Sequence, residues 1–288
     1  MRERSWWTPY LFLLPALLGL GTFQIAPIVV SFVGSLQTTT LRGETAFAGF
    51  ANYLTLFTNP IFWESLRVTA VFNLIINPLQ VAIALLLALL VFRPTPGVSL
   101  FRTFFFLPVT ISIAVTAILW SLLLDPNLGL VNGVLRSIGL ETQPFFRSAS
   151  QALGSFIALA TWRGVGYWMI FVLAGLYSIP VVVYEAARID GASNLRAFFS
   201  ITLPLLKRPL AFVLVADTAL NFLFFAPVYI ITSGGPLGST NLLMFEAYKT
   251  AFVYLDFGRS LALSSIILFI IAIIAALELR LFRTEVEY

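Results

Sequence analysis

Two charged residues are the exceptions to an otherwise apolar interior in this chain. Arg163 lies within the apolar run 152–178, and Asp217 lies within the apolar run 210–232. A charge at the centre of a bilayer costs on the order of 3 kcal/mol on insertion scales, so it is rarely found there without a partner or a function. A guanidinium and a carboxylate can contact a polar ligand, relay a proton, or form an ion pair that joins two helices. The residues alone support a ligand contact and a structural ion pair equally.

Two more polar side chains lie at matching depths in the same runs. Tyr167 is one helical turn from Arg163 on the same face. Counted from one membrane face, Arg163 and Asn221 are each about 11 residues in, and Asp217 is about 15 residues in. This offset of roughly four residues is about 6 Å along a helix, which an Arg side chain can span. If the two runs face each other, we expect these four groups to converge near the midplane, where transporters commonly hold substrate.

A polar segment separates these two apolar runs. Residues 182–188 include good helix formers, and Gly191 can adopt the positive φ that ends one short helix and re-aims the next. We expect a second helix over 194–201, with Pro204 and Pro209 marking its end and the entry to the next run. From the residues alone, a connector lying on the membrane and a docking site for a partner are equally supported. The apolar positions at helical spacing are Leu195, Phe198, Phe199 and Thr202.

The composition places the chain in a membrane. Of its 288 residues, 59% are hydrophobic and 10% are charged, and the mean hydropathy is +0.96; soluble domains carry about 25% charged residues. The chain has no His and no Cys, which excludes disulfides, thiolate chemistry and imidazole metal sites. We identify no catalytic residues and expect no metal, no cofactor and no enzyme activity. The net charge of +4 is small, and membrane topology explains it better than nucleic-acid binding does. We therefore expect the lipid bilayer as a partner and no nucleic acid.

The predicted fold class is an all-α polytopic membrane protein with six transmembrane helices. A helix needs about 20 apolar residues to cross a bilayer core about 30 Å thick. No connection is long enough for a soluble domain, so we expect a single transmembrane domain over 1–288. On the second run, Asn73, Asn77 and Gln80 form a polar stripe that favours hydrogen bonds between helices. The six runs are 10–36, 66–92, 103–124, 152–178, 210–232 and 260–281.

Lys and Arg are unequally divided between the two sides of the membrane. Ten of the 17 lie at the termini and in the second and fourth connections, six lie in the other connections, and Arg163 lies inside a run. Because cytoplasmic loops carry the excess of positive charge, we predict that both termini are cytoplasmic. The ten residues are Arg2, Arg4, Arg93, Arg102, Arg188, Arg196, Lys207, Arg208, Arg280 and Arg283.

The polar segment carries a motif that resembles that of a known family. Glu185-Ala186-Ala187 is followed after three residues by Gly191, and then by Ile201-x-Leu203-Pro204. This pattern resembles the EAA coupling loop, here 180–209, of permease subunits in binding-protein-dependent ABC importers. The likeness covers most of the chain and is to the sugar-importer branch, which includes maltose and glycerol-phosphate permeases. Further matches are Gly49-Phe50-Ala51-Asn52-Tyr53, Phe101-Arg102-Thr103 with Leu107-Pro108, Ala174-Gly175-Leu176 with Ile179-Pro180, and Thr232-Ser233-Gly234-Gly235-Pro236.

This resemblance implies a type I importer core with the bare six helices and assigns residues to two sites. The guanidinium, carboxylate and amide groups would bind the hydroxyls of an oligosaccharide, sugar or sugar derivative, and aromatic rings would contact its apolar faces. The positive charge of Arg163 is compatible with an acidic or phosphorylated sugar as substrate. The implied substrate residues are Gly164, Tyr167 and Asn221, which match the family, and Arg163, Asp217, Leu220 and Phe224, which differ from it. The implied ATPase-coupling residues are Glu185, Ala186, Ala187, Asp190, Gly191, Arg196 and Phe198.

The resemblance also implies partners that this chain lacks. No G-x-x-x-x-G-K-[ST] motif occurs in the sequence, so ATP hydrolysis must come from two separate cytoplasmic ATPase subunits. A second homologous permease subunit and an extracytoplasmic solute-binding protein would complete the importer. We therefore expect a multi-pass protein of a bacterial or archaeal cytoplasmic (inner) membrane.

An alternative function is an ion-coupled secondary transporter that uses Asp217 and Arg163 as an intramembrane relay. Such proteins usually contain inverted repeats, and none is visible in this sequence. They also have no need of the EAA motif. ATP dependence of uptake separates the two functions.

Overall fold

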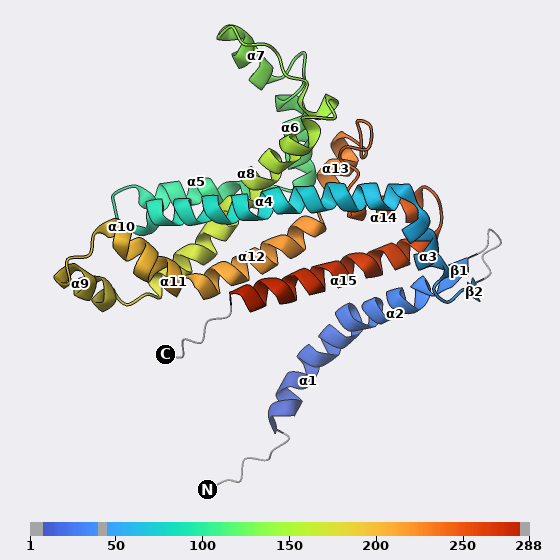
Figure 1. Ribbon diagram of the computed structural model, residues 1–288, viewed down its shortest axis with the longest axis horizontal. Helices are drawn as coiled ribbons and strands as arrows, with labels where there is room; N and C mark the ends of the chain where they lie inside the picture. Colours follow the sequence, from blue (N-terminus) through green and yellow to red (C-terminus); the bar gives the residue numbers. More distant parts are fainter. Residues whose placement is uncertain (1–7, 40–44, 283–288) are drawn as a thin grey trace. The chain divides into compact units, whose positions relative to one another are not determined.

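A computed structural model describes residues 8–39 and 45–282, which are almost entirely helical (Figure 1). Arg2, Arg4 and Arg283, which contribute to the predicted orientation, lie outside the described residues. The chain divides into two compact units. Among the described residues, the first comprises 8–39 and 45–62 with 246–269, and the second comprises 63–245 with 270–282.

The first unit contains one long apolar helix and a small hairpin. The helix is continuous over Tyr10–Ser35. The Asn52 side-chain amide donates to the backbone carbonyls of Ser35 at 2.8 Å and of Gln37 at 2.9 Å, which joins the end of that helix to the hairpin and to α3. The strands pair antiparallel with Gln37 opposite Phe47. The elements are α1 (Thr8–Leu20), a π-helical turn (Gly21–Ile25), α2 (Ala26–Ser35), β1 (Gln37–Thr39), β2 (Thr45–Phe47), α3 (Ala51–Thr58), and parts of α14 (Leu243–Phe252) and α15 (Phe257–Leu281).

The second unit is a helical bundle in which α8 is the most buried long span. Met169 and Val172 of α8 are fully buried and pack in one apolar core with Leu206 and Val213. Its elements are α4 (Pro60–Phe92, mostly in this unit), α5 (Val98–Thr110), α6 (Ile113–Leu123), α7 (Leu130–Ser137), a 3-10 turn (Phe145–Arg147), α8 (Ala152–Tyr177), α9 (Val181–Ile189), α10 (Asn194–Ala197), a π-helical turn (Phe198–Thr202), α11 (Leu203–Leu205), α12 (Lys207–Phe222) and α13 (Ala226–Ile231), with the end of α15.

Two glycines allow neighbouring helices to approach α8 closely. A Cβ atom at Gly166 would collide with the backbone carbonyl of Phe105 on α5. A Cβ atom at Gly175 would lie 2.7 Å from the ring of Pro209 on α12. Small residues at such contacts are the usual basis of helix packing in membranes, because they let the backbones approach. These contacts fix α5 and α12 against α8 and so determine the walls of the cavity described below.

The predicted spans are confirmed except for the third. Among the described residues, five helices are long and apolar enough to cross a membrane, and α5 with α6 forms a sixth candidate that is bent by 99°. The predicted run 103–124 is therefore broken and not one straight helix. Pro108 has no N–H to continue the helical ladder. Ile111 is extended and Ser112 is non-helical, each with ψ of 136°. The five are Tyr10–Ser35, Pro60–Phe92, Ala152–Tyr177, Lys207–Ile231 and Phe257–Leu281.

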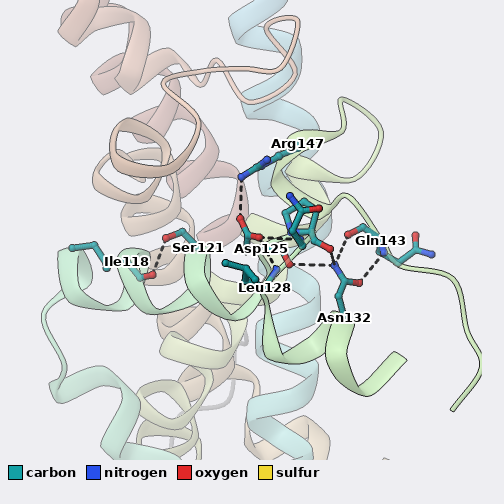
Figure 2. A network of polar contacts seen from close by, with 9 residues as sticks. Ile118, Ser121, Asp125, Leu128, Asn132, Gln143 and Arg147 are labelled. Carbon is teal, nitrogen blue, oxygen red and sulfur yellow. Dashed lines mark hydrogen bonds and ion pairs between the residues drawn. The ribbon is translucent and has the colours of Figure 1, made fainter. Parts of the chain in front are cut away.

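The connection between α6 and α8 is held by its own polar network (Figure 2). The Asp125 carboxylate accepts from the backbone N–H groups of Leu128 at 3.0 Å and Asn127 at 2.9 Å, and from Arg147 at 2.9 Å. The hydrogen bonds from Leu128 and Asn127 are the main reason that the pKa of Asp125 is lowered from 3.8. The buried Asn132 amide bridges to the backbone of Gln143 in both directions, at 2.8 Å each. These hydrogen bonds and the ion pair hold the connection between α6 and α8 in one conformation.

Candidate functional site

The predicted substrate residues line one cavity of about 420 Å³ in the second unit. The cavity lies between α8 and α12, with contributions from α4 and from the break between α5 and α6. The sequence prediction that these groups converge is thus confirmed, whereas their contact with a substrate stays a prediction. The predicted residues in the lining are Arg163, Gly164, Tyr167, Asp217, Leu220, Asn221 and Phe224.

Asp217 is held by an aromatic neighbour on α8. Its side chain is buried, with 2% of the residue exposed, and Oδ1 accepts a hydrogen bond of 2.7 Å from the Trp168 indole N–H. The other carboxylate oxygen, Oδ2, is buried and has no hydrogen-bond partner among the described residues. A buried polar atom without a partner is costly, and Asp217 is one of the residues that line the cavity, so its carboxylate is a candidate contact for a ligand.

Arg163 does not form an ion pair with Asp217 among the residues that the structure describes. Its Nη2 instead makes long contacts of 3.5 Å and 3.4 Å to the carbonyls of Val109 and Ile111, at the break between α5 and α6. The last carbonyls of a helix lack intrahelical partners and carry its negative dipole end, so they attract a guanidinium. Its Nε is buried and has no partner in the described part of the chain. The possible ion pair is therefore absent from the described residues, and one buried donor of Arg163 remains without a partner there.

Asn221 is bound from behind by the polar stripe of α4. Its Nδ2 donates to Asn77 Oδ1 at 2.8 Å and to Gln80 Oε1 at 3.1 Å. Asn77 also donates to Thr218 at 2.9 Å, and Gln80 donates to the Ala160 carbonyl at 2.8 Å. The prediction that the stripe makes hydrogen bonds between helices is confirmed.

The remaining predicted residues carry no charge and contribute to the shape of the cavity. A Cβ atom at Gly164 would lie 2.8 Å from the Gln80 amide nitrogen, so the glycine leaves room for Gln80. Phe224 is buried, and its ring packs 5.2 Å from that of Phe72. Tyr167 is half-buried and packs edge-on against Trp168, with ring centroids 4.9 Å apart.

Two polar residues near the cavity were not predicted, and a third was predicted in another role. Trp168, which was not predicted, and Gln80, which was predicted only to form hydrogen bonds between helices, line the cavity directly. Glu278 lies on α15 and accepts a hydrogen bond of 2.9 Å from Thr218, which is next to Asp217. Arg163 and Asp217 are therefore not the only charged exceptions to an apolar interior, contrary to the prediction, because Glu278 also lies inside an apolar span. Its charge within the run 260–281 was the available signal.

The polar segment between α8 and α12 forms the predicted helix–turn–helix. α9 ends at Ile189, and Gly191 follows with φ of +74° while the Ala192 N–H donates to the Ala187 carbonyl at 2.8 Å. This is a glycine-dependent helix stop. α10 begins after Ser193, whose hydroxyl accepts from the Arg196 N–H at 3.3 Å. The predicted second helix is confirmed.

The prediction that Pro209 marks the entry to the next run is confirmed, because Pro209 lies in the first turn of α12. Pro204 lies inside α11 and does not end helical structure as predicted. Proline is tolerated in a first helical turn because its missing N–H has no intrahelical partner there. Helical structure thus runs with little interruption from α10 through a π-helical turn into α12.

Most of the predicted coupling residues form an exposed surface. Ala187 is buried, and Phe198 is half-buried with its ring centroid 5.0 Å from that of Phe199. The Tyr184 and Thr202 hydroxyls lie 2.9 Å apart and join α9 to the π-helical turn. A groove of about 550 Å³ lies beneath, between this segment and the ends of α4 and α8. The exposed coupling residues are Glu185, Ala186, Asp190, Gly191 and Arg196.

Comparison with known proteins identifies the family. Residues 80–283 match the family described as "Binding-protein-dependent transport system inner membrane component". The chain is 36% identical over 288 residues to the probable ABC transporter permease protein YurN of Bacillus subtilis (strain 168), covering 97% of each. It is 32% identical over 284 residues to the sn-glycerol-3-phosphate transport system permease protein UgpA of Yersinia pestis bv. Antiqua (strain Antiqua), covering 98% of this chain and 96% of that one.

Solved structures show the same fold. One chain of a bacterial alginate ABC transporter, in complex with an alginate pentasaccharide-bound periplasmic protein, superposes with a TM-score of 0.83 at 23% identity. The match covers 99% of this chain and 100% of that chain. A second alginate transporter structure gives a TM-score of 0.79 at 22% identity. With its apolar spans and these relatives, the chain belongs to the family of multi-pass inner membrane permease components of binding-protein-dependent transport systems.

Proposed function

We propose that this chain is one permease subunit of an ATP-driven importer and that the cavity between α8 and α12 holds a carbohydrate or sugar derivative during passage. The observation that carries the proposal is the lining of one cavity of about 420 Å³ by all the predicted substrate residues. Two charged side chains of opposite sign lie in this lining without pairing to each other. A ligand that can satisfy both is the best explanation for keeping both.

The chemistry of the lining fits a polyhydroxylated ligand. Asp217 and Asn221 offer oxygen acceptors for hydroxyl groups, and Arg163 offers donors for a carboxylate, a phosphate or a hydroxyl oxygen. Tyr167 and Phe224 offer aromatic surface to the apolar face of a sugar ring. Relatives named for sn-glycerol 3-phosphate and for alginate transport both handle ligands that combine hydroxyls with an anionic group. This combination supports an acidic or phosphorylated sugar derivative.

The segment 180–209 would couple this cavity to ATP hydrolysis in partner subunits. Its exposed charges and the defined turn at Gly191 give a rigid surface that a cytoplasmic ATPase could contact. In this proposal residues 1–288 act as one permease domain with both termini in the cytoplasm. The partners are two ATPase subunits, a second homologous permease and an extracytoplasmic solute-binding protein. The proposed contacts are Glu185, Ala186, Ala187, Asp190, Gly191, Arg196 and Phe198.

Reconstituted uptake tests this function. The complex would be purified from native membranes through a tag on this chain, placed in proteoliposomes with its binding protein, and supplied with radiolabelled sn-glycerol 3-phosphate or an alginate trisaccharide. We expect uptake of at least one probe that needs ATP on the side of the ATPase and that persists when ionophores collapse ion gradients. Uptake that follows an ion gradient without ATP would support the secondary-transporter alternative and refute the proposal.

A further inference from the structure

The orientation of the Gln80 amide is fixed by a backbone carbonyl. Its Nε2 lies 2.8 Å from the Ala160 oxygen, which can only accept a hydrogen bond. The amide nitrogen must therefore face Ala160, and the amide oxygen must face the other way, toward Asn221 at 3.1 Å. Because a carbonyl oxygen can only accept, Asn221 must present its NH₂ group to Gln80.

The same orientation of Asn221 follows from the opposite end of the network. The single Thr218 hydroxyl proton is donated to a Glu278 carboxylate oxygen at 2.9 Å, so Thr218 accepts from Asn77 Nδ2 at 2.9 Å. This turns Asn77 Oδ1 toward Asn221, which donates to it at 2.8 Å. The Asn221 amide nitrogen thus faces Asn77 and Gln80, and it also stabilises the Asp217 carboxylate one turn away.

Consequently, the α12 wall of the cavity offers acceptors. Asn221 Oδ1 has no hydrogen-bond partner among the described residues, and neither has Asp217 Oδ2. The two residues are four apart and therefore lie on one face of α12, about 6 Å apart along its axis. On the α8 side, Arg163 Nε is a donor without a partner in the same described set. Among the residues that line the cavity, Asp217 and Asn221 on α12 therefore supply acceptors, and Arg163 on α8 supplies donors.

We propose that Gln80 and Asn77 are positioning residues that hold the Asn221 amide with its oxygen toward the substrate. The substrate then binds in one direction, with two hydroxyl donors toward Asp217 and Asn221 and its oxygen-rich or anionic end toward Arg163. This inference rests on the proposed function of the cavity and adds to it the polarity that the ligand must have. Neither Gln80 nor Asn77 needs to touch the ligand for this role.

A double-mutant cycle on uptake tests the positioning role. The probe is whichever of sn-glycerol 3-phosphate and alginate trisaccharide the native complex carries in proteoliposomes. Gln80→Leu should raise the KM for uptake roughly three- to tenfold, as expected for one lost hydrogen bond, and leave kcat within about twofold. In an Asn221→Ala background the same change should alter KM less than about twofold, because Gln80 acts through Asn221.

Two further variants separate positioning from folding. Gln80→Glu, protonated when buried, can donate to Ala160 and accept from Asn221, so its KM should stay within about twofold of native. Gln143→Leu makes the same loss of an amide in the connection between α6 and α8, away from the cavity, and should leave KM unchanged. If Gln80→Leu does not assemble, Gln80→Met keeps the side-chain length and should give the same rise in KM.

Three results overturn the inference. Equal rises in KM with and without Asn221 would show that Gln80 acts independently of it. A fall in kcat with unchanged KM would show a purely structural role. Uptake of neither probe by the native complex would remove the proposed function of the cavity and this inference with it, a result distinct from the first two.

Discussion

The Trp168 indole N–H donates a hydrogen bond of 2.7 Å to Asp217 Oδ1, and both side chains are buried. This bond links α8 to α12 and orients the carboxylate, so that Oδ2 remains without a partner among the described residues. Because an indole can only donate, it stabilises the carboxylate without competing for the second oxygen. A neutral donor thus takes the place of the possible ion pair with Arg163, whose guanidinium instead contacts the Val109 and Ile111 carbonyls.

Replacing Trp168 by Phe should destabilise the bundle. The change keeps an aromatic ring but leaves a buried carboxylate oxygen without its donor, which costs about 1–3 kcal/mol. Trp162→Phe is the matched control, since Trp162 is 41% exposed and its ring packs on Trp120. Thermal unfolding in mild detergent should show a lower midpoint for Trp168→Phe only. Equal midpoints for the two variants would mean that the indole bond does not hold Asp217.

A methyl group at Gly166 should separate α5 from α8. The added Cβ would collide with the Phe105 carbonyl, and such overpacking costs about 1–3 kcal/mol. Gly154→Ala makes the same change on α8 where no atom lies within 4 Å, so it should be neutral or slightly stabilising. Detergent unfolding of the two variants tests the packing. A Gly166→Ala protein as stable as Gly154→Ala would contradict the close approach of these helices.

Valine at Gly191 should uncouple the ATPase. The φ of +74° lies in the left-handed region, where a β-branched residue is strained, so the turn between α9 and α10 must change. Gly97 has φ of +84° with no atom within 4 Å, and Gly97→Val imposes the same strain on the connection between α4 and α5. In a tagged pull-down from native membranes, Gly191→Val should lose the ATPase and Gly97→Val should retain it. If both variants retain the ATPase, the assignment of this segment as the coupling loop is contradicted.

The connection between α6 and α8 should loosen only in acid. The pKa of Asp125 is lowered in the folded state, chiefly by hydrogen bonds from Leu128 and Asn127, so its stabilisation is present above the ordinary value of 3.8 and is lost as pH falls through the lowered value. The chain lacks cysteine, so a spin label at Leu128→Cys, which is 92% exposed, reports mobility directly. Mobility should rise below pH 3.8, and this step should be absent in Asp125→Asn. A rise at neutral pH would contradict this assignment.

The long apolar runs and the EAA motif were sufficient to predict the spans and the helix–turn–helix. Hydrophobic length sets a membrane helix almost by itself, and Gly191 determines the turn through its backbone freedom. The break at Ile111 and Ser112 could not be predicted from apolar length, because the run continues through it. Pro108 interrupts the helical hydrogen-bond ladder, but a proline alone does not specify a bend of 99°.

Counting residues from one membrane face along each span was enough to place Arg163, Asp217 and Asn221 in one cavity. It could not give their partners, because these depend on the rotation of each helix about its axis. Trp168 lies beside Tyr167 in the sequence, but only the packed structure turns its N–H toward Asp217. Similarly, the stripe on α4 predicted hydrogen bonds between helices but not that Gln80 would support Asn221.

Uptake by an Asp217→Asn variant tests most directly whether the cavity between α8 and α12 holds the substrate. Asparagine keeps the shape and an oxygen that can accept from Trp168, but it removes the negative charge of a carboxylate residue that lines the cavity. Asp125→Asn makes the same change in the connection between α6 and α8 and serves as the control. We predict that Asp217→Asn lowers kcat/KM for the carried probe about tenfold or more at equal protein levels, and that Asp125→Asn does not. Native uptake by Asp217→Asn would contradict the assignment of this cavity as the substrate site.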